Sequence, residues 1–353
     1  MVQGLAARIG RILSGRRMRI MHVCGTHEHT VSRHALRSIL PDGFELVSGP
    51  GCPVCVCPAV DIDQAVRLAR GGAVLATFGD MVRVPGGDGS LETARAEGAD
   101  VRIVGSVTGA VRLALEHADR DVVFLACGFE TTACTYAAAA LSGPPSNFSM
   151  LTSIRLIPPA LDALMRMEGV SLDGYLLPGH VCTVIGLEPF EPLAARGIPM
   201  AVAGFEPVDV LQGLALVAEQ AATGSPACDN AYGRLVRRGG NAVALEAMAS
   251  AFVVEDASWR GIGTIAGSGL VLRPGLEPLD ARRRFGLDEE TRPDSGMPAG
   301  CSCGLVLTGQ AAPSDCDLYA TACTPADPKG PCMISNEGAC RIAHVFDEQT
   351  GGR

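Results

Sequence analysis

Seven short apolar runs, each followed by a glycine-containing turn and a helix-like stretch, constrain the fold of this chain more than any other feature. The runs are rich in Val, Leu and Ile and lie at residues 19–23, 44–47, 73–77, 101–104, 122–126, 174–177 and 200–203. Strands that alternate with helices form parallel sheets. Because the runs are continuous and do not alternate with polar residues, each strand is expected to be covered on both faces. The sequence therefore predicts a doubly wound α/β architecture.

Three segments of the 353-residue chain are predicted to be separate domains. Residues 1–115 and 116–274 would each form an α/β domain with a doubly wound parallel sheet, and the second would contain helices at 159–167 and 208–222. After residue 274 the alternation of strands and helices ends, and the sequence becomes rich in Cys, Pro and Gly. Residues 275–353 are therefore predicted to form a small Cys-rich domain that is held together by something other than an apolar core.

Charge and cysteine content narrow the classes of function. The formal net charge of −9 argues against a nucleic-acid partner, which would need a basic surface. No apolar run approaches the roughly 20 residues that span a bilayer, and residues 1–19 are expected to form an amphipathic helix, not a signal peptide. We therefore expect a cytoplasmic protein. Since the cytosol keeps thiols reduced, the 14 cysteines indicate metal binding or redox chemistry.

Chemically reactive residues gather in the turns that follow the predicted strands. They are Cys24, His27 and Glu28 after the first strand, Cys52 and Cys55 after the second, and Glu130, His180 and Glu206 after later strands. In open parallel sheets, ligands bind beyond the carboxyl ends of the strands, where helix N-termini also offer free N–H groups. The predicted site is therefore the edge of the sheets that brings these Cys, His and Glu side chains together.

Cys24 allows three interpretations from sequence alone. With His27 and Glu28 close by, it could be a nucleophile beside its base. It could equally be a soft metal ligand whose sulfur is tuned by those two neighbours. The third interpretation is a buried, inert cysteine.

Cys52 and Cys55 form a Cys-x-x-Cys motif just before a predicted helix. Thiols near a helix N-terminus have a lowered pKa, which suits disulfide exchange. The motif could instead be half of a zinc site, with Cys57 as a third ligand. Glu130 and Glu206 have a similar alternative, because a carboxylate is also favourable as a helix cap.

The C-terminal segment contains six cysteines within 40 residues. They are Cys301, Cys303, Cys316, Cys323, Cys332 and Cys340. Zinc ribbons usually carry two Cys-x-x-Cys pairs, whereas this segment has one Cys-x-Cys and then long spacings, which favours a four-iron cluster over zinc. Such a cluster needs four thiolates. The predicted ligands are Cys316, Cys323 and Cys340, with either Cys301 or Cys303 as the fourth.

Eight short segments together resemble the HypD family of hydrogenase maturation factors, and the resemblance extends over nearly the whole chain. The segments are CGTHE at 24–28, GPGCPVC at 49–55, TFGDM at 77–81, GFETT at 128–132, LPGH at 177–180, AGFEP at 203–207, WRGIG at 259–263 and GPCM at 330–333. Any one of them alone would be a weak signal.

The resemblance implies a role that composition and spacing do not reveal. It implies two α/β domains plus a domain with a [4Fe-4S] cluster, in a complex with a HypC-type chaperone and a HypE-type cyanide donor that serves a hydrogenase large-subunit precursor indirectly. The complex would carry iron with cyanide and carbon monoxide ligands. Cys24 would hold that iron together with a cysteine of the chaperone, while Cys52 and Cys55 would relay electrons or disulfide equivalents.

The leading hypothesis is therefore a redox scaffold for building the iron centre of nickel–iron hydrogenases, and not a stand-alone catalyst. Its reactive residues would be Cys24, His27, Glu28, Cys52 and Cys55. Cys24, Glu130, His180 and Glu206 would contact the iron being assembled. The alternative is a cytosolic thiol–disulfide oxidoreductase with a structural metal site.

Overall fold

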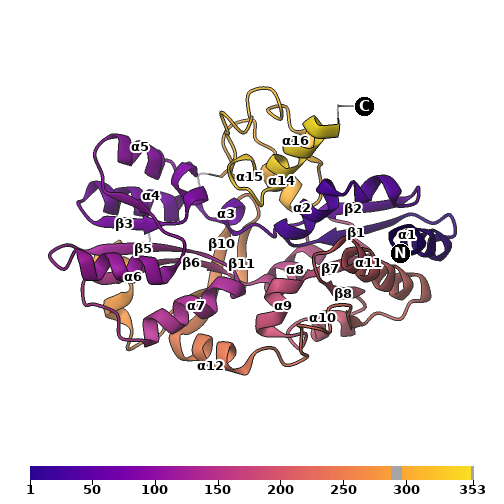
Figure 1. Ribbon diagram of the computed structural model, residues 1–353, viewed down its shortest axis with the longest axis horizontal. Coiled ribbons are helices and arrows are strands. Elements are labelled where there is room, and N and C mark those ends of the chain that lie inside the picture. Colours follow the sequence, from indigo (N-terminus) through magenta and orange to yellow (C-terminus); the bar gives the residue numbers. More distant parts are fainter. Residues whose placement is uncertain (288–295, 351–353) are drawn as a thin grey trace.

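Two sheets lie side by side in the computed structural model, which describes residues 1–287 and 296–350 and, for side chains, ends at residue 346 (Figure 1). The first sheet, sheet A, has the strand order β2–β1–β7–β8–β9, and all neighbouring strands are parallel. Its strands are β1 (Met18–His22), β2 (Phe44–Ser48), β7 (Gly174–Pro178), β8 (Met200–Ala203) and β9 (Cys228–Asn230).

The second sheet, sheet B, has the strand order β10–β11–β6–β5–β3–β4. Its strands are β3 (Val74–Thr77), β4 (Val101–Ile103), β5 (Val122–Gly128), β6 (Phe148–Arg155), β10 (Phe252–Trp259) and β11 (Gly263–Leu272). Strands β3 to β6 are parallel, but β10 and β11 run antiparallel. This corrects the expectation of a purely parallel sheet, because strands joined by a turn as short as 260–262 can pair only in the antiparallel sense.

All seven predicted strands are present, as β1 to β5, β7 and β8. The chain does not build one sheet after the other, however. It forms β1 and β2 in sheet A, moves to sheet B for β3 to β6, returns to sheet A for β7 to β9 and ends in sheet B. Each sheet thus contains strands from both sides of residue 115, while the domain boundaries at 115/116 and 274/275 stay predictions.

Helices cover both faces of each sheet, as a doubly wound fold requires. On sheet A, α1 (Val2–Leu13) and α11 (Pro207–Thr223) share one apolar core with the strands. Along β3, Leu75 packs with α4 and α5, whereas Val74 and Ala76 face the core of α6 and α7. The other helices that enclose the sheets are α2 (Gly25–Arg33), α4 (Ala59–Arg70), α5 (Leu91–Ala96), α6 (Val107–Glu116), α7 (Glu130–Leu141), α8 (Ile157–Met165), α9 (Gly179–Ile185), α10 (Glu191–Ala195) and α12 (Ala242–Ala251), with short 3-10 turns at η1 (Leu36–Ile39) and η2 (Gly79–Arg83).

The C-terminal segment lies over the junction of the two sheets, beside α2 and the short helix α3 (Pro53–Val56) (Figure 1). It consists of α14 (Cys303–Leu307), α15 (Pro331–Ile334) and α16 (Ala339–Thr350), with the turn η4 (Pro313–Asp315); η3 (Glu277–Leu279) and α13 (Ala281–Arg284) precede it. Leu307 and Met333 are buried in the same apolar core as Val56. The segment is therefore anchored on a shared core, contrary to the expectation that something other than apolar packing holds it.

Candidate functional site: a line of thiols

Cys24 lies where β1 ends and α2 begins, and it is the N-cap residue of α2. Its side chain is 9% exposed. Burial raises the pKa of the thiol to about 11, although the backbone N–H groups of His27 and Thr26 donate to the sulfur and partly offset this effect. A buried thiol of this kind keeps its proton at neutral pH unless a metal cation displaces it.

His27 faces the end of β8, not solvent. Its Nε2 is 3.0 Å from the carbonyl oxygen of Gly204, and its ring lies 5.0 Å from that of Phe205. Burial, and then the nearby His22, lower the pKa of His27 to about 3. His27 is therefore a neutral imidazole that holds the Cys24 turn against the AGFEP turn.

Glu28 is a buried carboxylate with a full set of donors. Arg37 donates to both of its oxygens at 2.8 Å, and Ser48 donates at 2.6 Å, while His22 Nε2 lies 2.6 Å away. Burial alone would raise the pKa of Glu28, but the charge of Arg37 and the hydrogen bond from His22 hold it well below its usual range. The network fixes α2, and with it Cys24, to β1 and β2.

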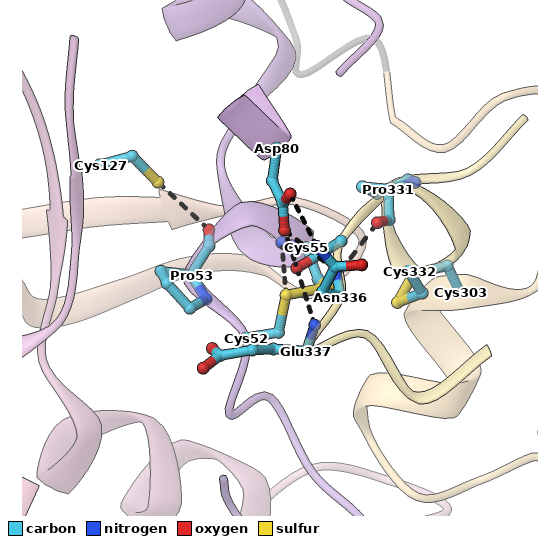
Figure 2. The surroundings of a disulfide bond; sticks show 11 residues. Cys52, Pro53, Cys55, Asp80, Cys127, Cys303, Pro331, Cys332, Asn336 and Glu337 are labelled. Carbon is cyan, nitrogen blue, oxygen red and sulfur yellow. Dashed lines mark hydrogen bonds between the residues drawn. A yellow bond between two sulfur atoms is a disulfide. The ribbon is translucent and has the colours of Figure 1, made fainter. Parts of the chain in front are cut away.

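The Cys-Pro-Val-Cys turn packs directly on Cys24. The N–H of Gly25 donates to the carbonyl oxygen of Gly51 at 3.4 Å, and a Cβ atom on Gly51 would collide with the backbone of Cys24. Cys52 and Cys55, which follow, are joined in a disulfide bond (Figure 2). The turn after β2 thus places a disulfide bond beside the Cys24 turn.

Glu337 also reaches this site, from the turn between α15 and α16. It lies against Gly25, because a Cβ atom on that glycine would be 2.5 Å from the Cβ atom of Glu337. Asp80 holds the turn by accepting hydrogen bonds from the backbone N–H of Asn336 at 2.9 Å and from its side-chain amide at 3.2 Å (Figure 2). Burial, and secondarily Asp80, raise the pKa of Glu337. Sequence reasoning missed Glu337, because an isolated glutamate far from any strand carries no local signal.

A second disulfide joins Cys303 to Cys332 and lies next to the first (Figure 2). The Sγ atom of Cys55 is 3.9 Å from the carbonyl oxygen of Pro331, the residue before Cys332. Cys303, predicted as a possible cluster ligand, is therefore not a free thiol in this structure. The spacing of cysteines in a sequence does not reveal which of them pair, and this leaves Cys301 as the available fourth ligand.

Four free thiols of the C-terminal segment lie close to one another. They are Cys301, Cys316, Cys323 and Cys340. They are close enough that the charges of the other three would each disfavour a thiolate at Cys340, whose pKa is raised chiefly by burial. Backbone N–H groups donate to two of the sulfurs, from Ser302 to Cys316 at 3.4 Å and from Lys329 to Cys323 at 3.2 Å.

This donor set fits a cubane cluster. Four thiols with amide donors aimed at their sulfurs are the surroundings in which iron–sulfur clusters are held. Among residues 1–287 and 296–346, no three His, Cys, Asp or Glu side chains are grouped closely enough to hold a single metal ion. A cubane, by contrast, spreads its four ligands around a larger core.

Similarity to known proteins identifies the family of this chain. Residues 1–347 match the family described as the hydrogenase formation hypA family, HypD. The chain is 42% identical over 335 residues to the hydrogenase maturation factor HypD2 of Bradyrhizobium diazoefficiens, covering 91% of this chain and 87% of that one. It is 39% identical over 360 residues to the HypD factor of Cupriavidus necator, covering 98% and 94%.

The chain belongs to the HypD family of hydrogenase maturation factors. In this HypD protein, none of the helices within the described residues has the length and apolar character needed to cross a membrane. The HypD-like motifs at 24–28, 49–55, 203–207 and 330–333 all meet at the line of thiols, which runs from Cys24 through the two disulfides to the four free cysteines.

The remaining predicted residues lie at the N-terminal ends of α9, α11 and α7. His180, at the start of α9, stacks on Phe205 with ring centroids 4.0 Å apart, and His27 packs on the same phenylalanine. Glu206 is exposed at the N-terminus of α11, where its N–H donates to Asp209 at 3.4 Å. Glu130 begins α7 and accepts a hydrogen bond from the N–H of Ile157 at 2.8 Å.

Two cysteines have surroundings that the sequence did not indicate. Burial, and then the nearby charges of Cys228, Glu130 and Cys24, raise the pKa of the Cys182 thiol. Cys57 faces sheet B, with its Sγ atom 3.3 Å from the Oγ atom of Ser153. Because Cys52 and Cys55 are disulfide-bonded, the half zinc site with Cys57 does not form in this structure.

Proposed function

We propose that this HypD-family chain is the scaffold on which the iron centre of a nickel–iron hydrogenase is assembled. The observation that carries the proposal is that Cys24, two disulfides and four further thiols, drawn from three distant parts of the sequence, converge at one buried junction. A thiol–disulfide oxidoreductase would need the disulfides but not the separate thiol of Cys24. The family membership also favours maturation.

Cys24 is proposed as this chain's ligand to the iron that it carries as cargo. Thiolate is the softest common side-chain ligand and suits iron that bears cyanide and carbon monoxide. A single thiolate leaves positions open for those diatomic ligands and for a cysteine of a HypC-type chaperone. The N–H donors from His27 and Thr26 would stabilise the thiolate once iron has displaced its proton.

Glu337 and His27 are proposed to support this ligand. Glu337 lies beside Cys24 and has a raised pKa, so it is suited to accept the proton that leaves the thiol. His27 is neutral and buried, and its Nδ1 has no hydrogen-bond partner among the described residues. It is therefore able to accept one hydrogen bond from a group bound near Cys24.

The two disulfides are proposed to be the relay of reducing equivalents. If Cys303 and Cys332 were reduced, their two thiols would reduce Cys52–Cys55 by thiol–disulfide exchange, in which two electrons and two protons move and one disulfide replaces the other. The contact between Cys55 and Pro331 places the pairs next to each other. Cys301, Cys316, Cys323 and Cys340 would hold a [4Fe-4S] cluster, which supplies single electrons when bound.

Cyanide would come from a HypE-type partner, and the finished iron group would leave for the hydrogenase large-subunit precursor through the chaperone. The whole exchange would take place in the cytoplasm, where thiols are kept reduced. These assignments extend the family role to this chain.

The decisive experiment is infrared spectroscopy of the anaerobically purified complex with the chaperone. In the Cys24→Ala variant we expect the cyanide and carbon monoxide bands to vanish while the cluster iron and the fold remain. Cys134→Ala is the matched control, because this cysteine on α7 is free and partly exposed, and it should keep full bands. Unchanged bands in Cys24→Ala would refute the assignment and direct attention to Cys52 or Cys55.

A further inference from the structure

An apolar pocket of about 370 Å³ lies beside α12, away from the line of thiols. Its walls come from the start of α8, the end of α9, α12, and the hairpin of β10 and β11. Leu156, Ile185, Met248 and Phe252 are among its lining residues, and every lining residue except Glu130 is apolar. This size and this composition are typical of sites for small organic ligands, which combine apolar walls with very few polar groups.

Glu130 is the one polar group in this pocket, and half of its carboxyl group has no partner. Its Oε1 accepts the hydrogen bond from the N–H of Ile157, whereas Oε2 is buried with no hydrogen-bond partner in the described part of the chain. Burial raises the pKa of Glu130 to about 7. Leaving a buried polar atom without a partner is unfavourable, so a ligand that bonds to Oε2 would remove that cost.

The rim of the pocket is unusually apolar for a protein surface. Of the ten residues of α12, only Ala251 is buried. The other nine are seven apolar residues, one serine and one glutamate. Val243 is 77% exposed, and Val254 on β10, which lines the pocket, is 58% exposed. Contiguous apolar surface around a concave site marks a place where something binds.

None of the residues that line this pocket is a cysteine of the line of thiols, and Cys182 on α9 lies between the two sites, close enough to feel the charges of both Glu130 and Cys24. Ile185, at the C-terminal end of α9, lines the pocket, whereas His180, at the N-terminal end of that helix, stacks on Phe205 beside His27. The pocket is therefore a second site, and its occupancy does not depend on the proposed role of Cys24.

We propose that this pocket binds an uncharged, mostly apolar small molecule that offers one hydrogen-bond acceptor to the Glu130 carboxyl group. The protonated carboxyl donates from Oε2 while Oε1 keeps its bond to Ile157. An anionic ligand is excluded, because its charge would be desolvated among apolar walls with no cation to pair with. A ligand without an acceptor leaves Oε2 without a hydrogen-bond partner.

Three probes of nearly equal shape separate these requirements. Acetophenone is uncharged and has an acceptor, ethylbenzene has no acceptor, and benzoate is an anion. The full chain, labelled with [¹³C-methyl]methionine, reports binding through the resonance of Met248, which is identified by its loss in Met248→Leu. At pH 6 we expect acetophenone to shift this resonance with the highest affinity of the three.

The pH dependence supplies the second readout. Because only the protonated carboxyl donates, the affinity for acetophenone should be constant well below pH 7 and fall about tenfold per pH unit well above it. In Glu130→Gln the amide donates at every pH, so this variant should bind acetophenone with no pH dependence.

Four results would overturn the proposal. The first two are no shift of the Met248 resonance with acetophenone at pH 6, and equal affinity for acetophenone and ethylbenzene. The third is that the affinity of Glu130→Gln for acetophenone falls with pH as much as that of the parent. The fourth is a shift of the Met248 resonance that grows with protein concentration in the absence of probe. The last result would assign the pocket to a second copy of this chain. None of the four would bear on the infrared bands of Cys24, so the two proposals fail separately.

Discussion

At the scale of single residues, Glu28 shows why a charge can be buried at the centre of this fold. The carboxylate accepts from Arg37, Ser32 and Ser48 and lies against His22, so each oxygen has at least two partners. Removing a charge from water is costly unless charged and hydrogen-bonding partners replace the water. Here the partners come from α2, β1, β2 and the residues after α2, and their convergence keeps Cys24 in place.

Replacing Glu28 by Gln should lower the free energy of unfolding at pH 7 by about 2–3 kcal/mol, because the donors around it lose a charged acceptor. The pKa of Glu28 is lower in the folded than in the unfolded chain, so its stabilisation is complete above its ordinary value of 4.5 and is lost as the pH falls below it. Glu28→Gln should therefore lose less stability on acidification than the parent.

Urea unfolding at pH 4 and pH 7 measures both effects. Glu45→Gln is the control, because Glu45 forms an ion pair with Arg19 but is 59% exposed. It should change the stability by less than about 1 kcal/mol. Equal losses in the two variants would show that the Glu28 network contributes no more than a surface pair.

At the scale of elements, the turns after β1 and β2 act as one unit. Gly51 is required there by proximity and not by its own backbone conformation, because a side chain would collide with the backbone of Cys24. The close approach sets the position of the Cys52–Cys55 disulfide relative to Cys24.

Gly51→Ala should therefore separate the two turns. We expect a loss of about 1–3 kcal/mol in the free energy of unfolding, as for other overpacked sites, and faster alkylation of Cys24 in the folded protein. Gly105→Ala is the control, since a Cβ atom at Gly105 meets nothing within 4 Å. Peptide mass spectrometry measures the rate at which Cys24 is alkylated. The same rate in both variants would contradict this account.

The elements also show what a sequence can and cannot predict. The seven predicted strands are continuous apolar runs, so the amino-acid sequence alone predicts that they are buried on both faces. Strand β6 was missed because Ser149, Thr152 and Arg155 are buried within it, where a polar residue signals a loop. Arg155 is held by the carbonyl oxygen of Ser258 and by Asp61, partners that only the folded chain supplies.

At the scale of the whole molecule, the candidate site could be predicted only in part. In open parallel sheets, ligands bind beyond the carboxyl ends of the strands. This rule depends only on the strands being parallel, so it was enough to predict Cys24, Cys52 and Cys55 at one edge of the sheet. Glu337 and the pairing of Cys303 with Cys332 depend on how the C-terminal segment folds over that edge. An apolar run likewise carries no information about its partner strand, so the alternation of the chain between the sheets was not foreseen.

The C-terminal segment should depend on its thiols. We expect Cys340→Ala to lose most of the iron that the parent binds under anaerobic conditions, because metal binding and local folding are coupled. Hydrogen exchange should become faster in residues 296–346 but not in the strands. Cys228→Ala is the control, a free cysteine on β9 outside the four. Iron content and exchange equal to the control in Cys340→Ala would rule out Cys340 as a ligand.

The order in which the chain visits the two sheets has a consequence for synthesis on the ribosome. When β1 and β2 emerge, the next strand of their sheet, β7, is still more than 100 residues away, and Glu337 comes later still. Neither sheet closes early, so the Cys24 turn has no finished surroundings in a nascent chain. The iron site proposed at Cys24 would consequently be absent from a half-made chain, and iron loading would wait for the completed molecule.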